Sequence, residues 1–157
     1  MLSFAEFQLW GIGMKNLGYA ICLALCTPSA AQAQGSLTCG AAENNWHLFE
    51  TLKRHFLEGD YRAFLTESGP MLAHEIENYD AYFGGLEQHF PDGFSMCQTV
   101  LVRAEPPNFR QEIVMFLHEE MRGPMTLLLT GVRIRGEAQL VYFNYNSSVT
   151  AVLDELR

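Results

Sequence analysis

The sequence predicts an α+β fold in which N-terminal helices pack on a curved, roughly four-stranded antiparallel meander sheet. Apolar residues recur every three or four positions between residues 45 and 90, which is the helical period. From residue 94 onward they alternate every two positions, which is the strand period. The connections between the expected strands are short enough for hairpins, and helices followed by a meander form two packed layers.

The first expected helix starts after Asn44 or Asn45, since an asparagine side chain can cap a helix N-terminus. It ends near Gly59, a residue type that favours the end of a helix. The apolar stripe of this helix consists of Leu48, Phe49, Leu52 and Phe56. A short second helix is expected over residues 60–65, before the turn at residues 68–70.

A third helix is expected from Met71, with apolar residues in alternating steps of four and three. These residues are Leu72, Ile76, Tyr79, Phe83, Leu86 and Phe90. The pair Gly84 and Gly85 lies inside this stretch. We expect it to kink or split the helix, because two glycines cost about 2 kcal/mol relative to alanine in a helix interior.

Four strands are expected after the turn at residues 91–93. They cover residues 94–104, 109–120, 125–135 and 138–146, which are rich in Val, Ile, Leu, Phe, Thr and Tyr. The second strand carries large apolar side chains on both faces. That pattern favours a central position or a covered outer face, and a homodimer through the sheet would supply the cover. One or two helical turns are expected over residues 150–156.

Residues 1–33 have the pattern of an export signal rather than of the domain. From Met14, the expected start, a basic Lys15 precedes an apolar run over residues 17–25 and a small-x-small cleavage site that ends at Ala33. The apolar run is far shorter than the roughly 20 residues that span a bilayer. We therefore expect a single secreted or periplasmic domain over residues 34–157, attached to a membrane only if the signal is not cleaved.

Cleavage changes the number of cysteines, because Cys22 and Cys26 lie in the signal and Cys39 and Cys97 remain. An even pair in an oxidising compartment predicts one disulfide. Closing a loop of this length stabilises the fold by about 4 kcal/mol in the chain-entropy model. Two buried free thiols are the alternative, and the absence of a Cys-x-x-Cys motif argues against a redox role.

The charge of the chain excludes some partners. The net charge is −8, and the signal contributes one acid and one base, so the domain keeps this charge. An acidic domain without a basic cluster repels nucleic acid and anionic membrane surfaces. The sequence contains no Gly-rich phosphate loop, no Gly-x-Ser-x-Gly elbow and no cofactor fingerprint, so we expect no cofactor.

Candidate metal ligands occur as three His-x-x-Glu pairs. They are His47 with Glu50, His55 with Glu58, and His74 with Glu77. Such spacing places both side chains on one helix face, where they can bind a metal. Solvated helix faces explain them better, and no third ligand completes a site, so we predict no metal site.

Two further pairs lie on expected strands. His118 and Glu120 share one side of the second strand and could form an acid/base pair. Arg133 and Arg135 share one face of the third strand and could hold an anionic ligand. Charged strand ends that face solvent are the simpler explanation of both pairs.

The order of these elements, with a first helix that ends in Gly59-Asp60-Tyr61, resembles the cone-shaped superfamily of nuclear transport factor two and ketosteroid isomerase. The resemblance covers roughly residues 44–146 and rests on element order. It implies a pocket between helices and sheet, where catalytic members place an Asp, Tyr or His. Tyr79, Tyr142 and His118 are the corresponding candidates for a binding pocket, and no catalytic residue is assigned. The strand that a complete cone has between its second and third helices is missing, so a cystatin-like helix-plus-meander fold is the alternative.

Three functions fit these observations. We expect an exported, non-catalytic domain that binds a small apolar molecule or a protein partner, since eleven Phe supply ample apolar surface. The alternatives are an isomerase, hydratase or cyclase that acts on an apolar substrate, and a homodimeric assembly module. A deep cavity with an inward acid or base would favour the enzyme, whereas a filled cavity with an apolar outer sheet would favour assembly.

Overall fold

The computed structural model describes residues 38–40 and 45–156 of the chain. The export signal predicted over residues 1–33 therefore lies outside the described residues. Every element below belongs to the compact unit Gly35–Arg157. Within the described part of the chain, no helix has both the length and the apolar character needed to cross a membrane.

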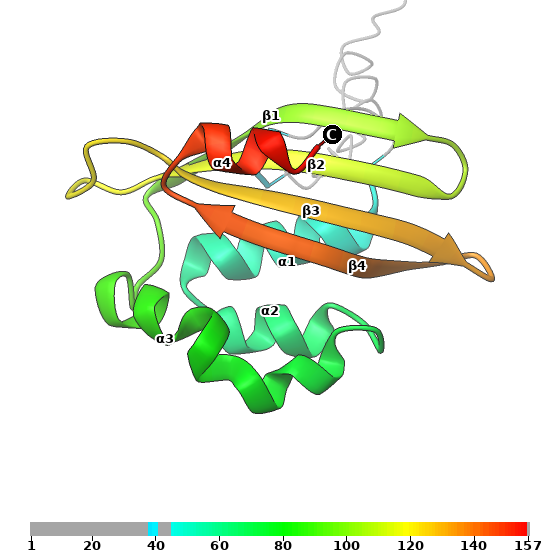
Figure 1. Cartoon of the computed structure of the whole chain (residues 1–157), viewed down its shortest axis with the longest axis horizontal. Coiled ribbons are helices and arrows are strands. Elements are labelled where there is room, and N and C mark those ends of the chain that lie inside the picture. Colours follow the sequence, from blue (N-terminus) through cyan, green and yellow to red (C-terminus); the bar gives the residue numbers. More distant parts are fainter. Residues whose placement is uncertain (1–37, 41–44, 157) are drawn as a thin grey trace, which may run out of the picture. The chain divides into compact units, whose positions relative to one another are not determined.

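The structure confirms the α+β fold class, with helices first and an antiparallel meander second (Figure 1). The helical elements are α1 (His47–Glu58), α2 (Tyr61–Glu67), the 3₁₀ helix η1 (Ala73–Asn78), α3 (Tyr79–His89) and the C-terminal α4 (Val149–Asp154). The strands are β1 (Met96–Glu105), β2 (Phe109–Leu117), β3 (Met125–Ile134) and β4 (Glu137–Asn146). They form one sheet in the order β1-β2-β3-β4, and all neighbours are antiparallel.

The ends of the first two helices follow local side-chain chemistry. Gly59 ends α1 in the left-handed conformation at φ 76°, as predicted. The N-cap of α1 is Trp46 and not an asparagine, and it makes no side-chain capping bond. The side chain of Asn45 instead accepts a hydrogen bond from Arg110. Asp60 caps α2 by accepting a hydrogen bond from the backbone N–H of Ala63 at 3.0 Å.

The third helix is divided, but at a different place from the one predicted. The 3₁₀ helix η1 gives way to α3 at Tyr79, and α3 runs without a break through Gly84 and Gly85. Tyr79 and Phe83 are both buried on this helix. Packing of such a stripe stabilises a helix more than intrinsic propensity does, which explains why the glycines do not interrupt it.

Aromatic rings fill the centre of the interface between the helices and the sheet. Phe56 of α1 has ring neighbours at 4.7–6.5 Å from α2, α3, β2, β4 and the segment before β1, namely Tyr61, Phe64, Phe83, Phe94, Phe116 and Tyr145. Phe116 and Leu127, which face the helices from the sheet, are fully buried in the same core. This packing uses much of the aromatic content noted in the sequence.

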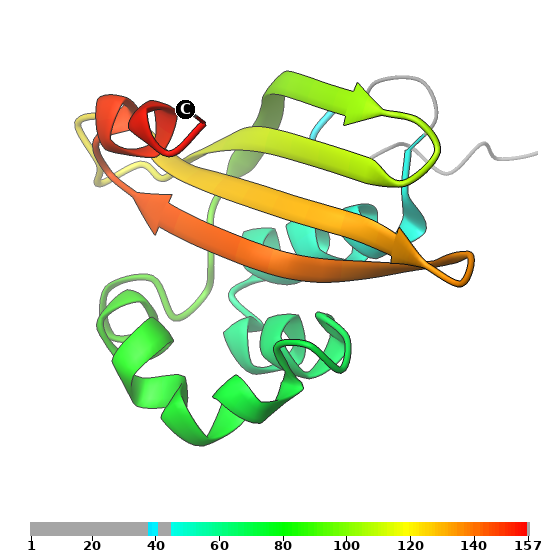
Figure 2. The same cartoon turned by 45° about the vertical axis from the view of Figure 1, so that its right-hand side comes forward.

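The outer face of the sheet carries the second, smaller core. Ile113 of β2 and Leu128 of β3 pack against Val152 of α4. Figures 1 and 2 show α4 on one face of the sheet and the other helices on the opposite face. The doubly apolar β2 is thus a central strand, as one of the two predicted explanations requires, and α4 supplies part of the outer cover.

Both edges of the sheet meet another segment of the chain. At β1, the backbone N–H of Thr99 donates to the carbonyl of Cys39 at 2.7 Å, and Cys39 forms the predicted disulfide with Cys97. At β4, the N–H of Leu140 donates to the carbonyl of Ser68 at 3.2 Å. Each strand also has an irregularity in register next to this contact. Such covers and bulges protect sheet edges from unwanted pairing.

Candidate ligand-binding groove

The three pocket candidates from the sequence lie in three different surroundings. Tyr79 is buried in the helical layer, with the guanidinium of Arg62 4.2 Å from the centre of its ring. Tyr142 lies on the outer sheet face and donates a hydrogen bond to Glu155 beyond α4. His118 follows β2, packs edge-on against Phe90 at 5.0 Å, and accepts a hydrogen bond from the N–H of Glu120. The sheet separates Tyr142 from the helical layer, so the structure does not bring the three together.

Burial raises the pKa of both tyrosines to about 12. For Tyr79 the nearby Glu87 adds to the effect of burial, and for Tyr142 the hydrogen bond to Glu155 adds to it. A raised pKa keeps both phenols neutral at physiological pH. Neither side chain is therefore prepared to act as a base.

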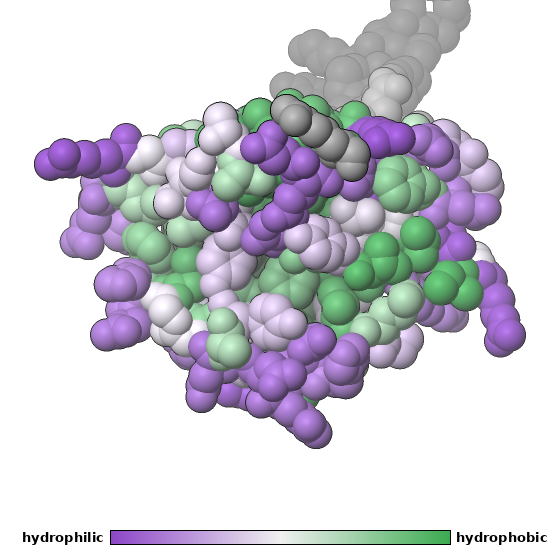
Figure 3. Space-filling model, viewed as in Figure 1, coloured by the Kyte–Doolittle hydropathy of each residue, from purple (hydrophilic) through white to green (hydrophobic). Residues whose placement is uncertain are grey.

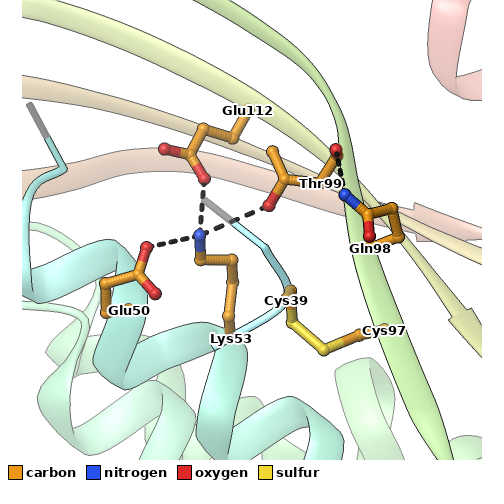
Figure 4. Close-up of a disulfide and its surroundings, with 7 residues drawn as sticks. All are labelled: Cys39, Glu50, Lys53, Cys97, Gln98, Thr99 and Glu112. Carbon is orange, nitrogen blue, oxygen red and sulfur yellow. Dashed lines mark hydrogen bonds and ion pairs between the residues drawn. A yellow bond between two sulfur atoms is a disulfide. The ribbon is translucent and has the colours of Figure 1, made fainter. Parts of the chain in front are cut away.

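A cluster of charged residues that the sequence analysis did not single out is buried between α1 and the sheet. Lys53 and Glu112 are 0% exposed, and Arg110 is 2% exposed. Figure 4 shows Lys53 reaching from α1 toward Glu112 and Thr99 on the sheet, with Glu50 on the same helix beside it. In this part of the interface between α1 and the sheet, charged side chains take the place that aromatic rings have around Phe56.

The distances within this cluster show how its charges are compensated. Lys53 Nζ donates to Glu112 Oε2 at 2.9 Å and to Thr99 Oγ1 at 3.4 Å, and forms an ion pair with Glu50 at 2.5 Å. Arg110 Nε donates to the other oxygen of Glu112 at 2.5 Å. Two cations thus face two carboxylates. Such compensation is required, because an unpaired charge at this depth would cost several kcal/mol.

The local sequence explains why these residues meet. Side chains of β2 alternate between the sheet faces, so that Arg110 and Glu112 point to the same side as Val114 and Phe116. Lys53 follows the buried Leu52 and borders the apolar stripe of α1. One half of the helix-facing surface of β2 is therefore ionic and the other half is apolar.

A groove of about 470 Å³ opens next to this cluster, between the start of α1 and the β1–β2 hairpin. Its lining residues are Trp46, Val102, Ala104, Pro106, Pro107, Phe109, Arg110 and Arg133. We call it the Trp46 groove. Its volume falls within the range of roughly 300–1,000 Å³ that is typical of small-molecule sites.

The indole of Trp46 is fixed in the wall of this groove. It is 7% exposed and meets the ring of Phe49 edge-on at 5.7 Å. The guanidinium of Arg133 lies 5.1 Å from the centre of the indole, within the range of a cation–π contact. Arg110 is held at the groove by Glu112 and by Asn45, whose Oδ1 accepts a hydrogen bond at 3.2 Å. The wall is therefore largely preformed.

The structure separates the two arginines that the sequence placed together. Arg135 lies in the turn after β3 with φ 56°, whereas Arg133 lies on the strand and lines the Trp46 groove. The other arginine that lines the Trp46 groove is Arg110 of β2. Sequence alone did not indicate this pair, although the alternation of Arg110 and Glu112 with apolar residues along β2 was a signal that could have revealed it.

The predicted His-x-x-Glu pairs form other contacts. Glu50 pairs with Lys53, and His74 pairs with Glu75 at 3.1 Å. His55 is buried, and its Nε2 lies 3.3 Å from Glu67 of α2. Across residues 38–40 and 45–156, no group of three or more His, Cys, Asp or Glu is placed to hold a metal ion.

No protein family, curated protein or solved structure compared with this chain matches it. An aromatic and aliphatic wall with a guanidinium at its edge can bind the body of a small apolar molecule and orient one polar group.

Proposed function

We propose that the chain is an exported, non-catalytic domain that binds a small, largely apolar molecule in the Trp46 groove. The observation that carries the proposal is the juxtaposition of a buried indole, a proline pair and aliphatic side chains around a space of ligand size. Fixed walls favour affinity, because little conformational entropy is lost when a ligand binds.

Export is part of the proposal and rests on the signal pattern in residues 1–33. The disulfide between Cys39 and Cys97 supports it, since disulfides persist in oxidising compartments and are rare in reducing ones. The arrangement of a helical layer on a four-stranded meander also supports a relationship to the cone superfamily. A shared architecture does not by itself assign an activity.

Binding is favoured over catalysis by the state of Glu112. A cone-type enzyme needs an inward acid or base, and Glu112 is the buried carboxylate closest to this role. Each of its oxygens already accepts a hydrogen bond from a cation, one from Lys53 and one from Arg110. Glu112 thus orients Arg110, and we assign it no proton transfer.

Tryptophan fluorescence tests the proposal. The chain has two tryptophans, so Trp10→Phe in the full chain leaves Trp46 as a reporter inside the groove. Titration with non-fluorescent alcohols of graded chain length should produce a saturable change in Trp46 emission. Native mass spectrometry of protein recovered from the cells that make it should show a retained small molecule.

A groove-blocking variant makes this test specific. Ala104 is exposed and lines the groove, so Ala104→Phe should fill it and abolish the response while the domain stays folded. Ala81→Phe, on the exposed surface of α3, is the matched control and should respond as the parent does. No saturable response in the parent, or an unchanged response in Ala104→Phe, would refute binding in this groove.

Assembly through the outer sheet face is a second candidate function. A hollow of about 250 Å³ on this face is lined by Met96, Cys97, Gln98, Val100, Met115, Leu117 and Pro124. These residues are uncharged, so two copies of an acidic chain can meet here without apposed carboxylates. Light scattering after size exclusion should then report a dimer that Leu117→Lys dissociates and that Met71→Lys, at a similarly exposed position on the helical side, leaves intact.

A further inference from the structure

We infer that the molecule bound in the Trp46 groove carries a carboxylate, and that Arg133 recognises it. The inference rests on the proposed function and specifies its ligand class. An apolar body would lie against Trp46 and the proline pair, and the carboxylate would meet the guanidinium at the edge of the groove.

The charge of Arg133 is the first support for this inference. Among the described residues, no carboxylate lies within 4.0 Å of its guanidinium, although the chain has a net charge of −8. The neighbouring cations Lys53 and Arg110 both have Glu112 as an ion-pair partner. A guanidinium that lines a groove without such a partner is suited to an external anion.

The donor capacity of Arg133 is the second support. A guanidinium has five N–H donors. Its described contacts are one hydrogen bond from Nη1 to the carbonyl of Gly136 at 3.4 Å and the cation–π contact with Trp46. Contact with the indole restricts where the guanidinium lies, and its remaining donors match the two oxygens of a carboxylate.

The surrounding charges determine the side from which an anion can approach. Glu67 and Glu137 line a separate hollow on the other side of Arg133, and their charges disfavour an anion there. Among the described residues that line the Trp46 groove there is no carboxylate, and Glu112, the partner of the lining residue Arg110, is compensated by Lys53 and Arg110. The buried cluster thus removes the repulsion that Glu112 alone would exert on a bound carboxylate.

Matched ligand pairs test the inference by calorimetry. Dodecanoate is compared with dodecanol, and indole-3-acetate with indole-3-acetamide, so that each pair shares one apolar body. Hydrogen bonds to a charged group predict that the acid binds at least about tenfold more tightly than its neutral partner. This preference should fall with increasing salt, because the recognition is electrostatic.

Two substitutions with the same change in charge locate the preference. Arg133→Gln should remove the preference for the acid, so that the acid and its neutral partner bind with the same affinity, and an unchanged circular dichroism spectrum shows that the domain is still folded. Arg135→Gln, in the adjacent turn, should retain the preference. Arg133→Lys should retain part of it, because a lysine keeps the charge and loses the paired donors.

The possible results separate this inference from the proposed function. Equal binding of acid and neutral compound by the parent would overturn the carboxylate while binding in the groove remained established. Binding of neither compound class in any pair would remove the support for both. A loss of preference in Arg135→Gln as large as that in Arg133→Gln would show that overall charge, and not Arg133, selects the ligand.

Discussion

Lys53 lies in surroundings that are unusual for a lysine. It is fully buried, and every described partner of its ammonium group is an oxygen of Glu50, Glu112 or Thr99. Moving two charges from water into a protein costs several kcal/mol per ion, which the attraction between them roughly offsets. The intact pair therefore adds little net stability, whereas the loss of one partner leaves an uncompensated charge in the interior.

Breaking this pair should be far more costly than breaking an equivalent pair at the surface. We expect Lys53→Met or Glu112→Gln alone to lower the free energy of unfolding by about 3–5 kcal/mol. The double variant should lose clearly less than the sum of the two losses, because each substitution removes the charge that the other leaves unpaired. Urea denaturation of the four proteins measures this coupling.

The chain provides a control at the same distance. Arg103 and Glu105 form an ion pair at 2.9 Å, the distance of the Lys53–Glu112 pair, but both are more than half exposed. Arg103→Met and Glu105→Gln should each cost less than about 1 kcal/mol. Equal losses at the two sites would contradict the role assigned to burial.

Periodicity predicted the apolar stripe of α1 but could not predict the buried cluster. A lysine that borders a stripe usually extends its charge to solvent. Whether the ammonium group of Lys53 reaches solvent or is buried depends on which side chains of the sheet lie opposite it. Glu112 lies 59 positions further along the chain, so this contact is set by the packing of α1 on β2, on which local spacing carries no information.

Among the elements, β1 is the strand that a disulfide links to another segment of the chain. It is an edge strand, and its described cover consists of the Cys39–Cys97 disulfide and the adjacent backbone hydrogen bond to Thr99. The even number of cysteines outside the predicted signal, together with the expected oxidising compartment, predicted this bond. The contact of Cys39 with the strand edge was not predictable, since residues 34–42 carry no strand pattern.

Loss of this disulfide should weaken the whole domain. The cysteines are 58 positions apart, and a loop of this size corresponds to about 4 kcal/mol in the chain-entropy model. We expect the midpoint of urea unfolding to fall on reduction, and the Cys39→Ala/Cys97→Ala variant to unfold at the reduced midpoint with or without reductant. A midpoint that is the same in the oxidised and reduced protein would show that the bond contributes nothing to stability.

The helices and the strands differ in how well their pattern predicted them. The strand ranges agree with the structure to within a few residues, because alternation and hairpin turns are local signals. The division of the third helix at Tyr79 was predicted at the wrong position. Glycines supply only a propensity, and the packing of Phe83 against Tyr61 and Phe143 overrides it.

At the scale of the whole molecule, the helical layer and the sheet are joined by aromatic side chains. Figure 3 shows, on the face viewed in Figure 1, hydrophilic residues along much of the edge and apolar residues between them. Tyrosines occur in both layers. Tyr61 and Tyr79 lie among the helices, and Tyr145 of β4 packs against Phe56 and Phe83. Their ionisation therefore reports on the packing of the complete domain.

Stability of the whole domain should consequently decrease in alkali. Burial is the main cause that raises the pKa of Tyr61, and it raises the pKa of Tyr79 and Tyr142 to about 12. Unfolded tyrosines titrate near 10, so above this pH the unfolded state releases protons that the folded state retains. The stabilising contribution is complete below pH 10 and is lost as the pH rises from 10 toward 12.

Urea unfolding at pH 8 and pH 11 measures this loss of stability. Tyr142→Phe should reduce the loss, because one phenol with a raised pKa is removed. Phenolate absorbance of the folded protein should rise with a midpoint above 10. A midpoint at 10 with unchanged stability would show that these tyrosines are as accessible in the folded domain as in the unfolded chain.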